Sequence, residues 1–129
     1  MYTPRIARWC SEMASIFLRR DEYDRAAEWG ARGLAIQDTI SRKSLFETLA
    51  LAEVRLDRAA AGEATAREGL AFYPESPLLH VDRAMALETL GRTGEAVAEY
   101  QRALNLGASE ASAEVIKAQI VRLTGKLGP

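Results

Sequence analysis

Small residues recur at a fixed interval along this chain, and this recurrence constrains its fold more than any other feature. Seven positions between 50 and 74 are matched 34 residues later: Ala50, Gly62, Ala66, Gly69, Leu70, Phe72 and Pro74 by Ala84, Ala96, Tyr100, Ala103, Leu104, Leu106 and Ala108. Six of them are also matched 36 residues upstream, by Ala14, Ala26, Gly30, Gly33, Leu34 and Ile36. A period of about 20 to 50 residues is typical of chains that stack one supersecondary unit on the next. The sequence therefore predicts a stack of three similar units.

The composition indicates that each unit is helical. Ala, Leu, Glu and Arg supply 65 of the 129 residues, whereas Val, Ile and Thr supply 18. The first group contains strong helix formers, and β-branched residues favour strands. The prolines stand at positions 4, 74, 77 and 129, which leaves two long stretches without the strongest helix breaker. We therefore predict an all-α fold with helices near 4–19, 22–36, 42–56, 58–72, 77–90, 94–106 and 110–124.

Helix-end signals support these ranges. Ser76 followed by Pro77 is typical of an N-cap and a first-turn proline. Gly91 and Gly107 are expected to end helices. Asp21 and Asp57 follow predicted helix ends, and we expect their side chains to cap the helices that come next.

Four glycines, Gly30, Gly33, Gly62 and Gly69, fall inside predicted helices. A glycine there costs about 0.5 to 1 kcal/mol relative to alanine. Close approach of a second helix offsets this cost, because the missing Cβ lets the backbones come nearer. Their recurrence at the repeat period predicts a seam between stacked units. A helical bundle with scattered glycines is the alternative.

The third unit, from Pro77 to Ala108, resembles the tetratricopeptide-repeat family. That family has a 34-residue helix-turn-helix unit with the pattern W-x2-L-G-x2-Y, A-x3-F and P. Ala84, Ala96 and Tyr100 stand at its Gly, Ala and Phe positions. The resemblance implies a right-handed α-solenoid forming a single domain, 1–129. It implies repeats near 7–38, 43–74 and 77–108, followed by a seventh, capping helix near 109–125.

The first helix of each unit has two distinct faces, taking about 100° per residue. One face, which includes Ala14, Ala50 and Ala84, is expected to pack into the core. In the resembled family the other face lines a concave groove where extended peptides or partner helices dock. We expect eleven residues to form this groove: Arg8, Ser11, Ser15, Leu18, Glu47, Leu51, Val54, Leu78, Val81, Met85 and Glu88.

Apolar side chains dominate the groove in the second and third units. If they are exposed, they form an apolar strip that a partner would cover, made of Leu51, Val54, Leu78, Val81 and Met85. Such a strip favours a protein-protein interaction module that acts as an adaptor, a scaffold or a small chaperone. A self-assembling protein whose groove binds a second copy is the alternative, and the last helix could also cover the strip. The family's clamp of Lys, Asn and Arg side chains for terminal carboxylates is not reproduced, because Ser11, Ser15 and Asp82 lie among its places.

Other classes of function are disfavoured. The 17 basic and 18 acidic residues leave a formal charge of -1, which argues against a nucleic-acid partner. No apolar run is long enough for membrane insertion, and we expect a cytoplasmic location. No cofactor motif or metal-ligand spacing is present, so we expect no enzyme activity, cofactor or metal. Cys10 and His80 are expected to be core residues, and Glu53 is expected to pair with Arg83.

Overall fold

Seven α-helices make up residues 3–126, the part of the chain that the computed structural model describes. They are α1 (Thr3–Arg19), α2 (Tyr23–Ala35), α3 (Arg42–Arg55), α4 (Ala59–Phe72), α5 (Pro77–Thr89), α6 (Thr93–Asn105) and α7 (Glu110–Lys126). Every bound lies within two residues of the predicted one. No strand occurs in this range, so the all-α prediction is confirmed. None of the described helices is long and apolar enough to cross a lipid bilayer.

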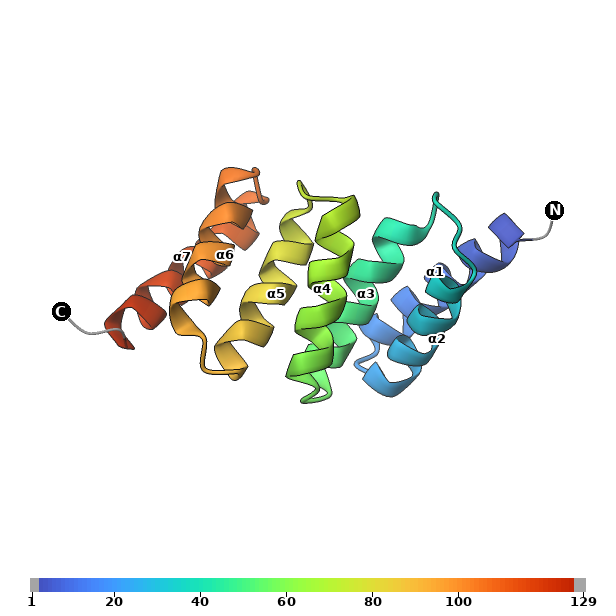
Figure 1. Cartoon of the computed structure of the whole chain (residues 1–129), viewed down its shortest axis with the longest axis horizontal. Coiled ribbons are helices and arrows are strands. Elements are labelled where there is room, and N and C mark those ends of the chain that lie inside the picture. Colours follow the sequence, from blue (N-terminus) through green and yellow to red (C-terminus); the bar gives the residue numbers. More distant parts are fainter. Residues whose placement is uncertain (1–2, 127–129) are drawn as a thin grey trace.

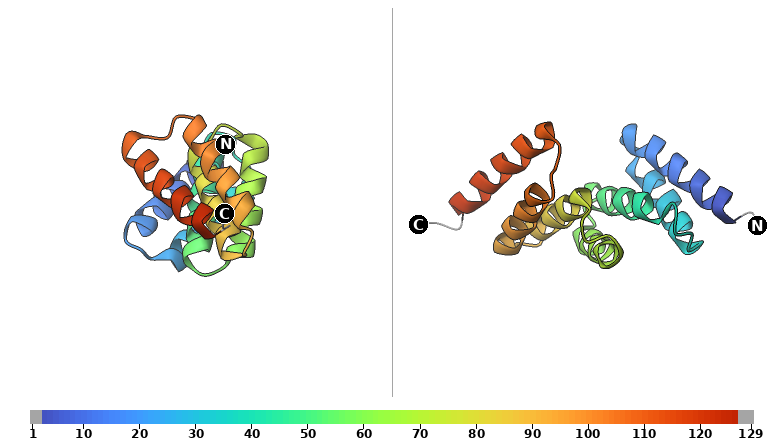
Figure 2. Two further views of the ribbon diagram at one scale, coloured as in Figure 1. Left: turned by 90° about the vertical axis from the view of Figure 1, so that its left-hand side faces the viewer. Right: turned by 90° about the horizontal axis from the view of Figure 1, so that it is seen from above.

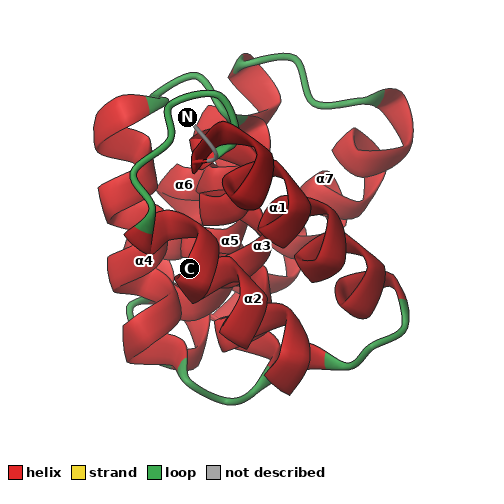
Figure 3. Cartoon of the chain, turned by 90° about the vertical axis from the view of Figure 1, so that its right-hand side faces the viewer, coloured by secondary structure: helices red, strands yellow, loops and turns green. Residues whose placement is uncertain are grey.

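Consecutive helices form pairs, and the pairs follow one another along the molecule. Figure 1 shows α1 and α2 at one end, α3 and α4 in the middle, α5 and α6 beyond them, and α7 at the far end. Each helix packs against the next in the chain, and α1, α3 and α5 also contact one another in turn. Figure 3 shows the short loops that join them. The chain is therefore a right-handed α-solenoid of three helix pairs with a seventh helix.

The solenoid is curved. Seen from above, α1 and α7 rise on the same side of the middle helices, so that the molecule forms an arch (Figure 2). The hollow side of this arch is bordered by α1, α3, α5 and α7, while α4 lies on the opposite side. This curvature gives the first helix of each pair a shared, inward-facing surface.

Small buried residues allow the helices to pack closely. Ala14, Ala50 and Ala84, which share one repeat position, are all fully buried. A Cβ added to Gly33 would lie 2.5 Å from Leu45 Cδ2, which shows how closely α2 approaches α3. The predicted seam between stacked units is confirmed for Gly30, Gly33 and Gly69, which meet residues of the neighbouring unit, whereas Gly62 of α4 packs against Val54 and Ala50 of α3 within its own unit.

In each helix pair, the turn between the two helices contains one residue with a left-handed backbone conformation, and this residue stands at the same repeat position every time. Asp21, Asp57 and Gly91 have φ values of 58°, 61° and 80°, and each follows the end of a first helix. Asp21 and Asp57 are therefore residues that terminate helices, and they are not N-caps. The N-cap positions are Glu22 and Arg58, and neither donates or accepts a side-chain cap hydrogen bond. The prediction for Ser76 is confirmed, because its Oγ accepts from the Leu79 N–H at 3.2 Å.

Candidate functional site

A hollow of about 690 Å³ opens between α3, α5 and α7 on the concave side of the arch. We call it the α3–α5–α7 hollow. Its residues come from α3, from the start of α5, from the loop before α7, and from the first turns of α7. They are Lys43, Glu47, Pro77, Leu78, Val81, Gly107, Ala108, Ser109, Ala111, Ser112, Val115 and Ile116. Leu78 and Val115 are 57% and 61% exposed, so the hollow presents apolar side chains to solvent.

The start of α5 positions this hollow. Ser76 caps α5, and Pro77 fits the first helical turn because its missing N–H would have no helical partner there. The Ser76 hydroxyl also donates to Glu47 Oε2 of α3 at 2.6 Å. This bond ties the N-terminus of α5 to the middle of α3, and it sets Leu78 and Val81 opposite the first turns of α7.

A second, smaller hollow of about 360 Å³ continues along α5 and α7. It is lined by Arg55, Val81, Met85, Glu88, Tyr100, Val115, Ile116, Gln119 and Arg122. Arg122 Nη2 lies 2.6 Å from Glu88 Oε2, which joins α7 to α5 across the hollow. Burial raises the pKa of Tyr100 to about 12, with Glu88 adding to the effect. Val81 lines both hollows, so the two form one continuous surface.

Five of the eleven predicted groove residues line these hollows: Glu47, Leu78, Val81, Met85 and Glu88. Leu51 is half-buried on α3. The predicted residues of α1 lie farther along the arch. There Arg8 pairs with Glu12, and Ser11 Oγ lies 3.1 Å from Ser44 Oγ of α3. Ser15 is half-buried on the same helix.

Two predicted groove residues pack between helices instead. A Cβ on Gly62 of α4 would lie 2.8 Å from Val54 Cγ2, so Val54 points towards α4. Leu18 packs against the buried cluster of Ala26, Ala27, Leu49 and Ala52, where α1, α2 and α3 meet. The helical period placed both residues at the margin of the inward face, and the neighbouring helices cover that margin.

The last helix covers part of the predicted apolar strip. Val81 and Met85 are half-buried and pack against the core cluster that includes Ile116 and Leu123 of α7. Leu78 remains the most open member of the strip. The expectation of a continuous exposed strip is therefore corrected to a surface whose wall is supplied by α7.

The inward residues of α7 were not among the predicted groove residues, although the repeat period contains the signal for them. Adding 34 to Val81 gives Val115, and adding 34 to Met85 gives Gln119. Both residues line the hollows. The helix thus occupies the place of a fourth first helix, and its inward residues could have been read from the same period. Lys43 and Arg55 at the edges of α3 were also missed.

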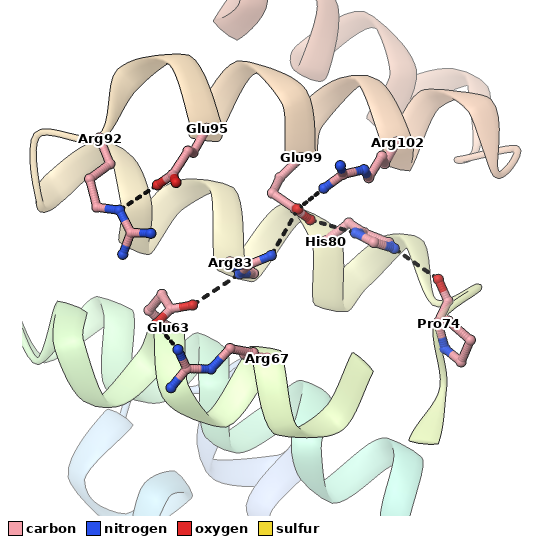
Figure 4. A network of polar contacts seen from close by, with 9 residues as sticks. All are labelled: Glu63, Arg67, Pro74, His80, Arg83, Arg92, Glu95, Glu99 and Arg102. Carbon is pink, nitrogen blue, oxygen red and sulfur yellow. Dashed lines mark hydrogen bonds and ion pairs between the residues drawn. The ribbon is translucent and has the colours of Figure 1, made fainter. Parts of the chain in front are cut away.

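A buried polar network joins α4, α5 and α6 (Figure 4). Arg83 Nε donates to Glu63 Oε2 at 2.9 Å, and its Nη1 donates to Glu99 Oε1 at 3.0 Å. Glu53 instead accepts from the Thr65 hydroxyl at 2.5 Å. The predicted Glu53–Arg83 pair is therefore wrong. Arg83 reaches the second helices on both sides of α5, and Glu53 lies against α4.

His80 and Cys10 take structural positions, as predicted. Both are buried. His80 Nε2 lies 2.8 Å from the Pro74 carbonyl oxygen and its Nδ1 lies 2.6 Å from Glu99 Oε2, so both ring nitrogens are engaged. Burial raises the pKa of the Cys10 thiol. Within residues 3–126, no group of three or more His, Cys, Asp or Glu side chains is arranged to hold a metal ion.

A further hollow, of about 570 Å³, lies between α2, α3 and α4, away from the α3–α5–α7 hollow. The side chains that line this hollow pack against one another. The Arg42 guanidinium carbon lies 4.6 Å from the centre of the Phe72 ring, and Phe72 stacks on Phe46 with ring centres 6.0 Å apart. Because these groups already satisfy one another, we do not regard this hollow as the functional site.

Known structures share this architecture. The first tetratricopeptide-repeat domain of Spaghetti (RPAP3), bound to the HSP90 peptide SRMEEVD, has a TM-score of 0.85 and 19% identity, covering 97% of this chain and 95% of that one. The second such domain of human RPAP3, in complex with the HSP70 peptide SGPTIEEVD, has a TM-score of 0.81 and 17% identity over 95% and 98%. A tetratricopeptide-repeat-like protein from Chlorobium tepidum has a TM-score of 0.80 and 20% identity over the whole of both chains.

These similarities establish the fold. No protein-family model matches the sequence. No curated protein matches it. The chain nevertheless has the fold of tetratricopeptide-repeat domains, which confirms the resemblance that its 34-residue period indicated.

Proposed function

We propose that this chain is a non-catalytic protein-interaction module that binds a segment of another protein, as an extended peptide or an amphipathic helix, in the α3–α5–α7 hollow. One observation carries the proposal. Leu78 of α5 and Val115 of α7 are each more than half exposed and face a common hollow of about 690 Å³. Burying such side chains against a partner yields about 25 cal/mol for each Å² of apolar surface removed from water.

The arrangement of helices supports a docking role. The hollow lies on the inward face of a curved stack, where several helices contribute to one surface. Solenoids use such concave surfaces to bind extended partners. Two similar structures contain peptides of HSP90 and HSP70, which shows that this architecture accommodates peptides in those proteins. The proposal retains the cytoplasmic location expected from the sequence.

The test uses a display library of random twelve-residue peptides selected against the folded chain. Selected peptides should lose at least tenfold in affinity for Leu78→Glu and for Val115→Glu, since each places a charge inside the hollow. Ile40→Glu is the matched control, because Ile40 is 83% exposed in the loop between α2 and α3. Equal binding by wild type and both hollow variants would refute the assignment.

Self-association through the same hollow is tested with the same variants. Sedimentation of the wild type from micromolar to near-millimolar concentration should show a monomer. A dimer that Leu78→Glu dissociates would identify a second copy as the occupant and would overturn the proposal of a foreign segment.

A further inference from the structure

Apolar side chains lie exposed along one side of α1, the helix at the N-terminal end of the stack (Figure 1). Ile6 and Trp9 are 48% and 53% exposed, and Ile16 is also exposed. Together with the half-buried Met13, they follow one another at intervals of three, four and three residues, so they share one side of the helix. We call these four residues the α1 end face. Large apolar side chains gathered on one exposed surface are typical of interaction sites.

The same surface is covered in the other two units. Leu45 of α3 and Leu79 of α5 stand at the repeat position of Trp9, and both are fully buried. Ala52 of α3 stands at the position of Ile16, and it is fully buried as well. The face that is open to solvent in the first unit is therefore part of the core in the second and third units.

The cover over α3 is α2, the second helix of the preceding pair, and it approaches with glycines. A Cβ added to Gly33 would lie 2.5 Å from Leu45 Cδ2, and a Cβ added to Gly30 would lie 3.1 Å from Leu49 Cβ. Leu49 stands at the repeat position of Met13. A helix can come this near only if the residues that face its partner are small. Here the two small residues are three positions apart.

The next interface repeats this arrangement. A Cβ added to Gly69 of α4 would lie 3.0 Å from Leu79 Cδ1 of α5. A second helix with small residues thus covers the position of Trp9 wherever a helix pair precedes it. No described helix precedes α1, so this established mode of packing has one position without an occupant.

Trp9 is held in place for such a contact. Its ring meets the Trp29 ring of α2 edge to face, with ring centres 5.0 Å apart. The Arg32 guanidinium carbon lies 5.2 Å from the centre of the Trp29 ring. A side chain that is ordered before binding loses little conformational freedom when a partner docks. Tryptophan and arginine are also the residues that most often dominate the binding energy of interfaces.

Positive charge flanks the α1 end face. Three arginines and one glutamate of α1 are exposed: Arg5, Arg8, Arg19 and Glu12. Arg8 pairs with Glu12 at 3.1 Å, which leaves an excess of positive charge on the helix. At about 100° per residue, these charges lie on the side of α1 next to the end face. A partner with acidic residues along that edge would meet complementary charge.

We propose that the α1 end face docks an α-helix of another protein, in the position that the second helix of a preceding pair would take. This helix presents two small residues, glycine, alanine or serine, three positions apart against Trp9 and Met13. It carries acidic residues along the edge that faces the arginines of α1. The inference goes beyond the proposed function, because the end face shares no residue with the α3–α5–α7 hollow.

The test uses a display library of a small helical scaffold with one randomised helix face, selected against the folded chain. Helices selected for the end face should bind at least tenfold more weakly to Trp9→Glu and to Ile6→Glu, since each places a negative charge there. Ile6→Glu keeps the Trp9–Trp29 contact, so it reports on docking even if Trp9→Glu loosens α1. Val121→Glu is the control, because Val121 is 72% exposed on α7 at the other end of the stack. Circular dichroism checks that each variant is folded.

The selected helices also test the chemistry of the partner. They should be enriched in small residues three positions apart and in acidic residues at one edge. Replacing both small residues by leucine should weaken binding at least tenfold, and exchanging the acidic residues for lysine should weaken it at least threefold. Fluorescence anisotropy gives the affinities. Leu78→Glu should bind these helices within twofold of the wild type.

The outcomes separate this inference from the proposed function. A selection without helices that depend on Trp9 and Ile6 would overturn the docking site at α1. Dependent helices without the pair of small residues would overturn the assigned partner. A wild-type dimer that Trp9→Glu dissociates would identify a second copy as the occupant, which also contradicts the proposal. Failure of Leu78→Glu to affect the peptides selected for the α3–α5–α7 hollow would refute only the proposed function.

Discussion

His80 Nδ1 lies 2.6 Å from Glu99 Oε2 and joins α5 to α6 inside the third repeat. Glu99 also accepts from Arg83 of α5 and from Arg102 of its own helix, although only 1% of it is exposed. Arg83 in turn reaches Glu63 of α4. One buried carboxylate thus connects the third helix pair internally and, through Arg83, to the second pair.

Removing this carboxylate should be strongly destabilising. Glu99→Ala removes one of two partners from His80 and from Arg83, which are buried or half-buried, and breaking such a buried pair costs about 3 kcal/mol. Urea denaturation followed by circular dichroism measures the loss in the free energy of unfolding. Glu95→Gln is the control on the same helix, because the Glu95–Arg92 pair lies on the surface and should matter little. Similar losses for the two variants would contradict the role assigned to Glu99.

Double-mutant cycles should show that Arg83 interacts with Glu99, its partner in the structure, and not with Glu53, the partner that its helical position suggested. Arg83→Met and Glu99→Leu should show a coupling energy of about 1 to 3 kcal/mol, because the two side chains form a hydrogen-bonded pair. Arg83→Met and Glu53→Leu should be additive within about 0.5 kcal/mol, since Glu53 bonds to Thr65. Urea midpoints of the single and double variants give both values. Strong coupling of Arg83 to Glu53 would contradict the network.

The seam between α3 and α4 should not tolerate an added methyl group. A Cβ on Gly62 would lie 2.8 Å from Val54 Cγ2 and 3.3 Å from the Ala50 carbonyl oxygen, and neither a helical valine nor the backbone yields easily. We expect Gly62→Ala to cost about 1 to 2 kcal/mol, and Val54→Ala to restore part of it. Gly94→Ala, where a Cβ meets nothing within 4 Å, should be neutral or stabilising by up to about 1 kcal/mol. Thermal unfolding compares the three variants.

Asp82, a buried residue whose Oδ2 has no hydrogen-bond partner among residues 3–126, should make stability depend on pH. Because its pKa is raised well above 3.8 in the folded state, the folded chain retains this proton to a higher pH than the unfolded chain. Its contribution to stability is fully present below the unfolded pKa and is lost as pH rises through the folded pKa. Asp82→Asn carries no such proton, so its stability relative to wild type should rise between pH 4 and 8, by about 1 kcal/mol. A constant difference between the two across this range would contradict the buried, unpaired state of Asp82.

Helix positions and the stacking of pairs could be predicted because both depend on local or periodic features. Runs of helix formers between Pro4 and Pro74, and again after Pro77, leave few alternatives to helix. Ala14, Ala50 and Ala84 marked the packed face because a repeated unit must pack in a repeated way. The groove was predicted from helical position and the family resemblance; five of its eleven residues line the hollows, and its role in binding stays a prediction.

The partners of side chains could not be predicted in this way. Helical position placed Glu53 and Arg83 on comparable faces, but a long arginine side chain reaches any helix around it. In the structure, Arg83 pairs with Glu63 and Glu99. Val54 lay at the edge of the inward arc, where a few degrees of helix rotation decide between the groove and α4. Such choices depend on the crossing of helices that are distant in sequence.

The amino-acid sequence alone determined that this chain is helical, that it repeats every 34 to 36 residues, and that small side chains mark where its units meet. These properties follow from propensity and from a period that any stack of identical units must share. Only the tertiary structure decided that α7 walls the hollow beside Leu78, and that one oxygen of the buried Asp82 carboxylate has no partner among the described residues. The reason is geometric: curvature brings residues of α3, α5 and α7 to one surface, and burial there fixes which charges are compensated.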